Sequence, residues 1–136
     1  MRSSLRLLFW LTALFAFVMA VLPHPPLLVP VWDKLQHFGA FASLMAVAML
    51  AYPRVRSIKL ALALCSFGAL IELVQGLPMV HRDADVHDWV ADLLAIFVVL
   101  VLAQLWKPMR ASALFLALAV SRLRRDNGRA KGQGQS

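Results

Sequence analysis

Four apolar segments follow one another along the chain, each bounded by charged residues or prolines. They cover residues 7–22, 38–52, 60–71 and 93–106, and polar flanks lengthen the last three. The hydrocarbon core of a bilayer is about 30 Å thick and takes about 20 helical residues to cross. The pattern therefore predicts an all-α fold: a polytopic membrane helix bundle with about four transmembrane helices and short loops.

Polar side chains gather at one end of each of the last three segments. The second and fourth segments begin with them, and the third ends with them. In chain order these residues are Asp33, Lys34, His37, Glu72, Gln75, His87, Asp88 and Asp92. Because consecutive spans cross in alternating directions, the three polar ends are predicted to lie on one side of the membrane. An ionisable group facing lipid costs about 3 kcal/mol on insertion scales, so we expect these side chains to face the bundle interior.

The first apolar segment has two interpretations. It follows Arg2 and Arg6 and stops at a proline cluster that begins at Pro23, as a first transmembrane helix would. Residues 18–20 also resemble the small-residue cleavage site of a secretory signal peptide. We adopt the span, with a cleaved signal peptide as the alternative.

Beyond the fourth segment the chain changes character. Residues 111–120 are apolar but too few to cross a bilayer, and three arginines follow them closely. This predicts a short interfacial amphipathic helix over residues 111–125. Residues 126–136 are rich in Gly, Gln and basic residues, so we expect a disordered basic tail there. The transmembrane domain is therefore predicted to cover residues 1–110.

The composition agrees with a membrane protein of one domain. Of the 136 residues, 61% are hydrophobic and only 15% are charged, and the mean hydropathy is +0.73, which is too apolar for an average soluble domain. The net charge of +7 lies in short clusters beside the apolar segments. Such clusters suit anionic membrane lipids rather than nucleic acid. The single cysteine, Cys65, cannot form an intramolecular disulfide, and the oligomeric state is not predicted.

The basic residues also predict an orientation. With four alternating spans, twelve of the 14 Lys and Arg residues fall on one side, and only Lys34 and Arg82 fall on the other. The positive-inside rule makes the basic side cytoplasmic, so both termini are expected inside a bacterial inner or plasma membrane. The three polar helix ends are then expected at the extracytoplasmic face.

The second segment carries the first candidate site residues. Asp33 and His37 are four residues apart and share a helix face, so the carboxylate could orient the imidazole and raise its basicity. Lys34 can reach the same cavity. The alternative is structural: Asp33 caps the helix, and Lys34 is an interfacial cation that extends toward the headgroups.

The third and fourth segments carry the remaining candidates. Gly68, Glu72 and Gln75 fall on one helix face, and Gly68 allows close approach of a neighbour. Asp88 and Asp92 are four residues apart and repel each other unless a cation such as Arg82 or Lys34 lies beside them. The alternative to a functional site is an ion-pair network that only fastens three helix ends.

No metal or cofactor is predicted. The chain has no H-E-x-x-H motif and no cysteine pair, and the adjacent residues His87 and Asp88 cannot both point along one helix face. A nucleophilic serine of the G-x-S-x-G type is also absent.

The ordered motifs resemble one known family. Asp33-Lys34-x-x-His37, Gly68-x-x-x-Glu72-x-x-Gln75, and Arg82 followed by Asp88-x-x-x-Asp92 resemble the pattern of the VanZ-like membrane proteins, named for a member associated with teicoplanin resistance. The resemblance covers about residues 32–103. Family members usually have Asn at the position of Asp92 and often Gly at that of Ala95. The resemblance implies a multi-span protein of the cell envelope and an antibiotic-resistance context, but it does not name a reaction.

Together these features predict a polar site that acts on or binds a lipid-linked or amphiphilic envelope molecule at the outer leaflet. The residues expected to carry chemistry are Asp33, His37, Glu72 and Asp88. Those expected to hold the ligand are Lys34, Gln75, Arg82 and Asp92. Whether the protein is an enzyme is left open. One alternative is non-catalytic binding of a glycopeptide-like ligand or a partner membrane protein, and another is a proton-coupled transporter.

Overall fold

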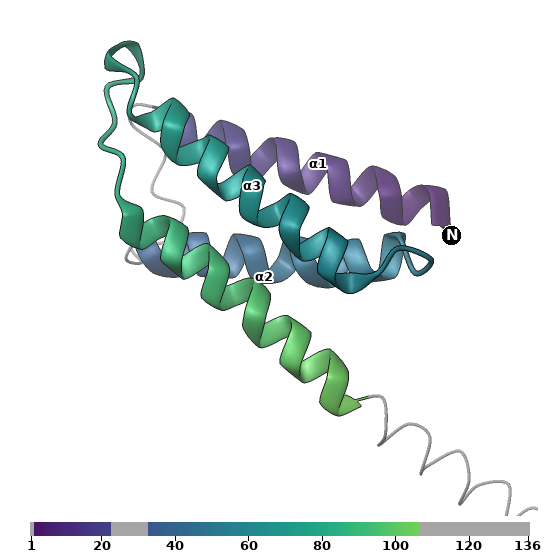
Figure 1. Ribbon diagram of the computed structural model, residues 1–136. Coiled ribbons are helices and arrows are strands. Elements are labelled where there is room, and N and C mark those ends of the chain that lie inside the picture. The colour runs from purple at the N-terminus through teal and green to yellow at the C-terminus, as the bar shows by residue number, and fades with distance from the viewer. Residues whose placement is uncertain (1, 23–32, 107–136) are drawn as a thin grey trace, which may run out of the picture. The chain divides into compact units, whose positions relative to one another are not determined.

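The computed structural model describes residues 2–22 and 33–106 (Figure 1). This part of the chain contains four long helices, one short 3-10 helix and no strand. They are α1 (Arg2–Val21), α2 (Asp33–Ala51), α3 (Ser57–Gln75), η1 (Pro78–Val80) and a last helix, Val86–Trp106. All four long helices are long and apolar enough to cross a membrane, which confirms the predicted all-α class and the number of candidate spans. The interfacial helix predicted over residues 111–125 and the tail over 126–136 lie outside the described residues.

Local sequence signals explain where the helices end. Helix α2 ends two residues before Pro53, as expected because the residue preceding a proline is disfavoured in the helical conformation. A tight turn follows, in which the Val55 amide donates to the Tyr52 carbonyl over 2.9 Å. At the end of α3 the Gly76 amide donates to the carbonyl of Glu72 over 3.0 Å. Consecutive long helices run in alternating directions (Figure 1).

Residues 1–100 form one compact unit, and the last six described residues of the fourth helix belong to a second. Within the first unit, α1, α2 and α3 each pack against the other two. The core lies mainly along α2, where Phe41, Leu44 and Met45 are almost fully buried. Alanines such as Ala48 and Ala95 complete it. Small residues of this kind let membrane helices approach one another closely.

Large apolar side chains cover the outside of all four long helices. Trp10, Leu62, Leu73 and Phe97 are each more than half exposed. In water such a surface would favour aggregation, whereas in a bilayer it would face lipid tails at no hydrophobic cost.

Two hydrogen bonds join α1 to its neighbours, one from its middle and one at its C-terminal end. The Trp10 indole donates to the Tyr52 hydroxyl over 3.1 Å, which joins α1 to the residue that follows α2. At the C-terminal end of α1, the Gln75 amide donates to the Ala20 carbonyl over 3.0 Å. The polar ends of α2, α3 and the fourth helix meet at this end of the unit.

Candidate functional site

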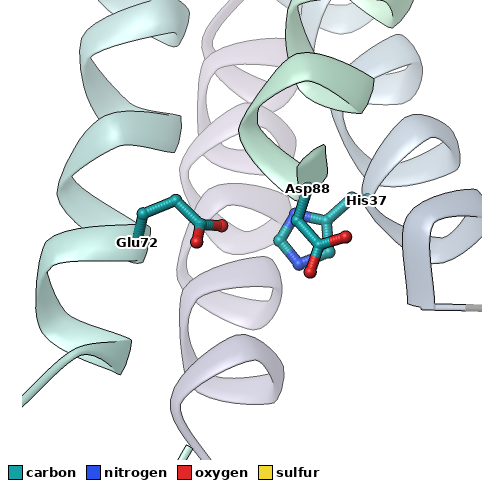
Figure 2. A group of neighbouring side chains, drawn as sticks. All are labelled: His37, Glu72 and Asp88. Carbon is teal, nitrogen blue, oxygen red and sulfur yellow. The ribbon is translucent and has the colours of Figure 1, made fainter. Parts of the chain in front are cut away.

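Three polar side chains from three helices meet at this end of the unit. His37 comes from α2, Glu72 from α3 and Asp88 from the start of the fourth helix, and each offers one ligand atom within 4.8 Å of the others. Figure 2 shows the Glu72 side chain reaching from α3 toward the neighbouring side chains of His37 and Asp88. The structure therefore brings together three of the four residues predicted to carry chemistry.

His37 is paired with a carboxylate of the fourth helix. Its Nδ1 lies 3.1 Å from Asp92 Oδ1, and the two residues are only 7% and 0% exposed. When Asp92 is ionised, Nδ1 donates the hydrogen bond, and in the neutral ring Nε2 is then the nitrogen that accepts a proton or binds a metal. The pair holds the imidazole in one orientation, as an acid–base residue requires.

This pairing assigns Asp92 a role that the sequence did not. We predicted that Asp33 orients His37 and that Asp92 binds the ligand. The side chain of Asp33 lies outside the described part of the structure, so its predicted role stays a prediction. Asp92 is distant from His37 in sequence, and helical spacing cannot reveal a pair formed between two helices.

Glu72 is held by the loop that precedes the fourth helix. Its Oε2 accepts a hydrogen bond from the Asp85 amide over 2.9 Å. Its Oε1 is buried and has no hydrogen-bond partner among the residues that the structure describes. A buried carboxylate oxygen without a donor is costly, so this atom is the clearest indication that the cluster binds a proton, a cation or a ligand group.

Lys34 forms the rim of the site. Its Nζ lies 2.7 Å from Asp85 Oδ2 and 3.2 Å from Asp88 Oδ1. The Lys34 side chain is 52% exposed, whereas that of Asp88 is 6% exposed, so the cation bridges the surface and the buried cluster. Lys34, one of the two cations that could offset the repulsion between Asp88 and Asp92, therefore lies beside Asp88.

Asp85 was missed by the sequence analysis. It accepts hydrogen bonds from the backbone amide and Nδ1 of His87 at 2.9 and 2.6 Å. Its pKa is held far below the ordinary aspartate value, first by the hydrogen bond from Lys34 and then by those from His87. Asp85 therefore stays ionised at neutral pH and fixes Lys34 at the rim. The sequence signal for Asp85 was an acidic residue just before a helix. That signal is ambiguous, because it indicates helix capping as readily as a functional site.

Gly68 makes room for the buried carboxylate. A Cβ atom at this position would lie 2.6 Å from Asp92 Oδ2 and 3.1 Å from Trp89 Cδ1. The Trp89 indole in turn donates to the Cys65 carbonyl over 3.1 Å, which fastens the fourth helix to α3. The predicted close approach at Gly68 is therefore present, and the group that approaches is a side chain of the site.

Two predicted ligand-binding residues lie elsewhere or at the edge. Gln75 is buried and donates its amide hydrogen bond to Ala20 of α1, so it joins α3 to α1. Arg82 is half-buried in the segment that connects η1 to the fourth helix. In the same segment His81 is exposed and adopts a left-handed backbone conformation, with φ of 53°.

The charges define what this cluster can do. Glu72, Asp88 and Asp92 place three carboxylates beside the one imidazole of His37, and Lys34 neutralises part of their charge from the rim. Three neighbouring buried carboxylates cannot all remain ionised without a counter-charge, so the cluster is suited to exchanging protons or binding a cation. The exposed rim is suited to an anionic polar group.

Comparisons with known proteins add no further constraint. No family model, curated protein or solved structure matches this chain. The resemblance to the VanZ-like proteins therefore rests on the motif residues alone.

Proposed function

We propose that this protein is a cell-envelope membrane protein whose polar site handles the headgroup of a lipid-linked or amphiphilic molecule. The observation that carries the proposal is the meeting of His37, Glu72, Asp88 and Asp92 from three helices that are otherwise apolar enough to span a membrane. Polar side chains in membrane-spanning helices cost free energy of insertion into lipid, and side chains kept there despite this cost are usually functional.

The site is proposed to open to the extracytoplasmic side of a bacterial inner or plasma membrane. The support is the distribution of basic residues, because Lys34 and Arg82 are the only two of 14 that fall on the polar side of a four-span topology. A headgroup in the outer leaflet would then contact the rim of the site directly. Cytoplasmic cofactors such as ATP would have no access to a site on that side of the membrane.

Within this proposal each residue has a chemical role. His37, oriented by Asp92, takes a proton from the bound molecule or gives one to it. Glu72 and Asp88 are the candidate partners for the second proton transfer, and Lys34 pairs with an anionic group of the headgroup. VanZ-like membership and a link to glycopeptide resistance remain part of the proposal, supported by the three motifs.

A specific observation also favours the non-catalytic alternative. Lys34 already pairs with Asp85 and Asp88, and such a network could serve binding alone. Proton-coupled transport is less suited, because the carboxylates of the described spans all gather at one end of the helices. A proton path would require ionisable groups along the rest of the span.

Substitution of Glu72 distinguishes catalysis from binding. The purified protein is incorporated in vesicles made from extracted envelope lipids, and the lipid composition is followed over time by mass spectrometry. If the protein is an enzyme, the lipid composition changes, and Glu72→Gln stops this change although the bound amphiphilic molecule still copurifies with the protein. If the protein only binds, the lipid composition stays the same, and Glu72→Gln reduces the amount of amphiphilic molecule that copurifies with it.

Ser66→Ala is the matched control on the same helix. Its hydroxyl is exposed and donates to the Leu62 carbonyl one turn earlier, over 3.0 Å, so this variant should match the wild type in both measurements. If neither turnover nor a copurifying amphiphile is found with the wild type, the proposed function is wrong.

A further inference from the structure

We propose that His37, Glu72 and Asp88 bind a single divalent transition-metal ion of the Zn²⁺ type. The proposal goes beyond the function above, which requires no metal. In the metal-bound protein these three side chains would act as ligands rather than as proton donors and acceptors, while the site would still handle the same headgroup. It also departs from the expectation drawn from sequence, which looked for metal ligands at fixed spacing on one helix. Here the three ligands come from three helices, an arrangement that no short motif can indicate.

The distances fit a metal site before an ion is bound. The candidate ligand atoms all lie within 4.8 Å of one another. Zn²⁺ binds imidazole nitrogen and carboxylate oxygen at about 2.0–2.2 Å in tetrahedral geometry, so two ligand atoms of one ion lie about 3.4 Å apart. Closing the remaining distance takes up to about 1.4 Å, which small side-chain rotations can supply.

The surroundings of His37 support metal binding. Histidines that bind metals almost always donate their other ring N–H to a carboxylate or carbonyl, which sets the tautomer and the orientation of the ring. Asp92 Oδ1, at 3.1 Å from Nδ1, is placed for this role. Because Asp92 is fully buried, it would act on the metal through His37 and is a positioning residue.

Glu72 provides a second, independent indication. Within residues 2–22 and 33–106, its buried Oε1 has no hydrogen-bond partner, while its Oε2 accepts a hydrogen bond from the Asp85 amide. A bound cation would satisfy Oε1, and the amide would fix the carboxylate as an outer-shell contact. The charges agree as well, because Glu72, Asp88 and Asp92 carry three negative charges when ionised, Lys34 offsets one of them, and a divalent cation balances the other two.

The ligand set indicates the type of ion and the type of site. One imidazole with two carboxylates suits Zn²⁺ or Mn²⁺ better than soft ions, which prefer thiolates. Three protein ligands leave at least one coordination position for water or a substrate oxygen, as in catalytic zinc sites. The ion would therefore face the same molecule that the polar site handles.

Metal content and affinity test the inference directly. The full-length protein, purified in detergent and stripped with a chelator, is titrated with Zn²⁺ and Mn²⁺, and bound metal is measured by elemental mass spectrometry. We expect one ion per chain for the wild type. His37→Ala, Glu72→Gln and Asp88→Asn should each lose it, whereas His81→Ala, which changes an exposed loop histidine, should retain it. Asp92→Asn should keep one ion but bind it about 10–100-fold more weakly.

A spectroscopic measurement covers the case in which a ligand variant fails to fold. X-ray absorption of the zinc-loaded wild type should show a first shell of one imidazole nitrogen and oxygens, with no sulfur. The inference would be overturned if the wild type bound no more metal than His37→Ala. It would also be overturned if the zinc bound by Glu72→Gln and by Asp88→Asn kept the first shell of the wild type. Loss of the metal site would leave the proposed function intact if the amphiphile still copurifies, so the two can fail separately.

Discussion

Replacing Gly68 by alanine should disrupt the buried His37–Asp92 pair. The new Cβ would lie 2.6 Å from Asp92 Oδ2, whereas ordinary contact begins near 3.4 Å, so the carboxylate must move by about 0.8 Å. The Trp89 and Phe41 side chains border the same space at 3.1 and 3.4 Å from that Cβ. Asp92 therefore cannot retreat without disturbing its neighbours or leaving His37.

The size of the effect follows from three opposing contributions. Overpacking a buried position costs about 1–3 kcal/mol, and a buried carboxylate that loses its partner costs about another 1–3 kcal/mol. Alanine favours the helix over glycine by about 1 kcal/mol. The expected net loss of unfolding free energy is therefore about 1–5 kcal/mol. Gly39→Ala is the matched control in α2, because nothing in the described part of the chain lies within 4 Å of its added Cβ, and it should be neutral or slightly stabilising.

The unfolding free energy is measured by titrating the protein from mild micelles into SDS and following helicity. Nitrogen NMR of the His37 ring, in a sample labelled only at histidine, reports the hydrogen bond to Asp92 separately. Gly68→Ala should unfold at lower SDS and lose the hydrogen-bonded Nδ1 signal. Equal stability of Gly68→Ala and Gly39→Ala, with the His37 signal unchanged, would refute the close packing on which this argument rests.

Three further predictions concern topology, pH and packing. A reporter fused after Ser57 should read cytoplasmic and one fused after Arg82 external; an external signal at Ser57 would reverse the orientation. The lowered pKa of Asp85 means that its ion pair stabilises the fold fully above the ordinary aspartate pKa of 3.8 and is lost as the pH falls through the lower folded value. The stability difference between wild type and Asp85→Asn should thus stay constant from pH 7 to about pH 5 and shrink below about pH 4; a difference that vanishes between pH 7 and 5 would contradict this. Gln75→Ala removes the bond to Ala20 and should cost about 1–3 kcal/mol in the same SDS titration without changing metal content; altered metal content would place Gln75 in the site after all.

The helices were predictable because hydropathy and prolines act locally along the chain. The apolar segments indicated all four helices, although α1 begins at Arg2 rather than at residue 7. Hydropathy marks only the apolar part of a helix, and a basic first turn is invisible to it. The gathering of the polar ends was also predictable, since it requires only alternating spans.

The pairing inside the site was not predictable from spacing. Helical periodicity relates residues within one helix, but the rotation of each helix about its axis is set by packing between helices. The contact of His37 with Asp92 and the turning of Gln75 toward α1 both depend on that rotation. Asp85 acts partly through its backbone amide, which carries no sequence signal.

Lipid-resolved native mass spectrometry of the protein purified from its own membranes can show whether the rim of the polar site holds an anionic headgroup. Lys34→Gln removes the cation at the rim of the site, and Lys59→Gln removes the same charge from the first turn of α3, at the other end of that helix from Glu72. We expect the wild type and Lys59→Gln to carry a discrete amphiphile with an anionic headgroup and Lys34→Gln to lose it. Identical bound lipids in all three proteins, or loss in Lys59→Gln alone, would contradict headgroup binding at this site.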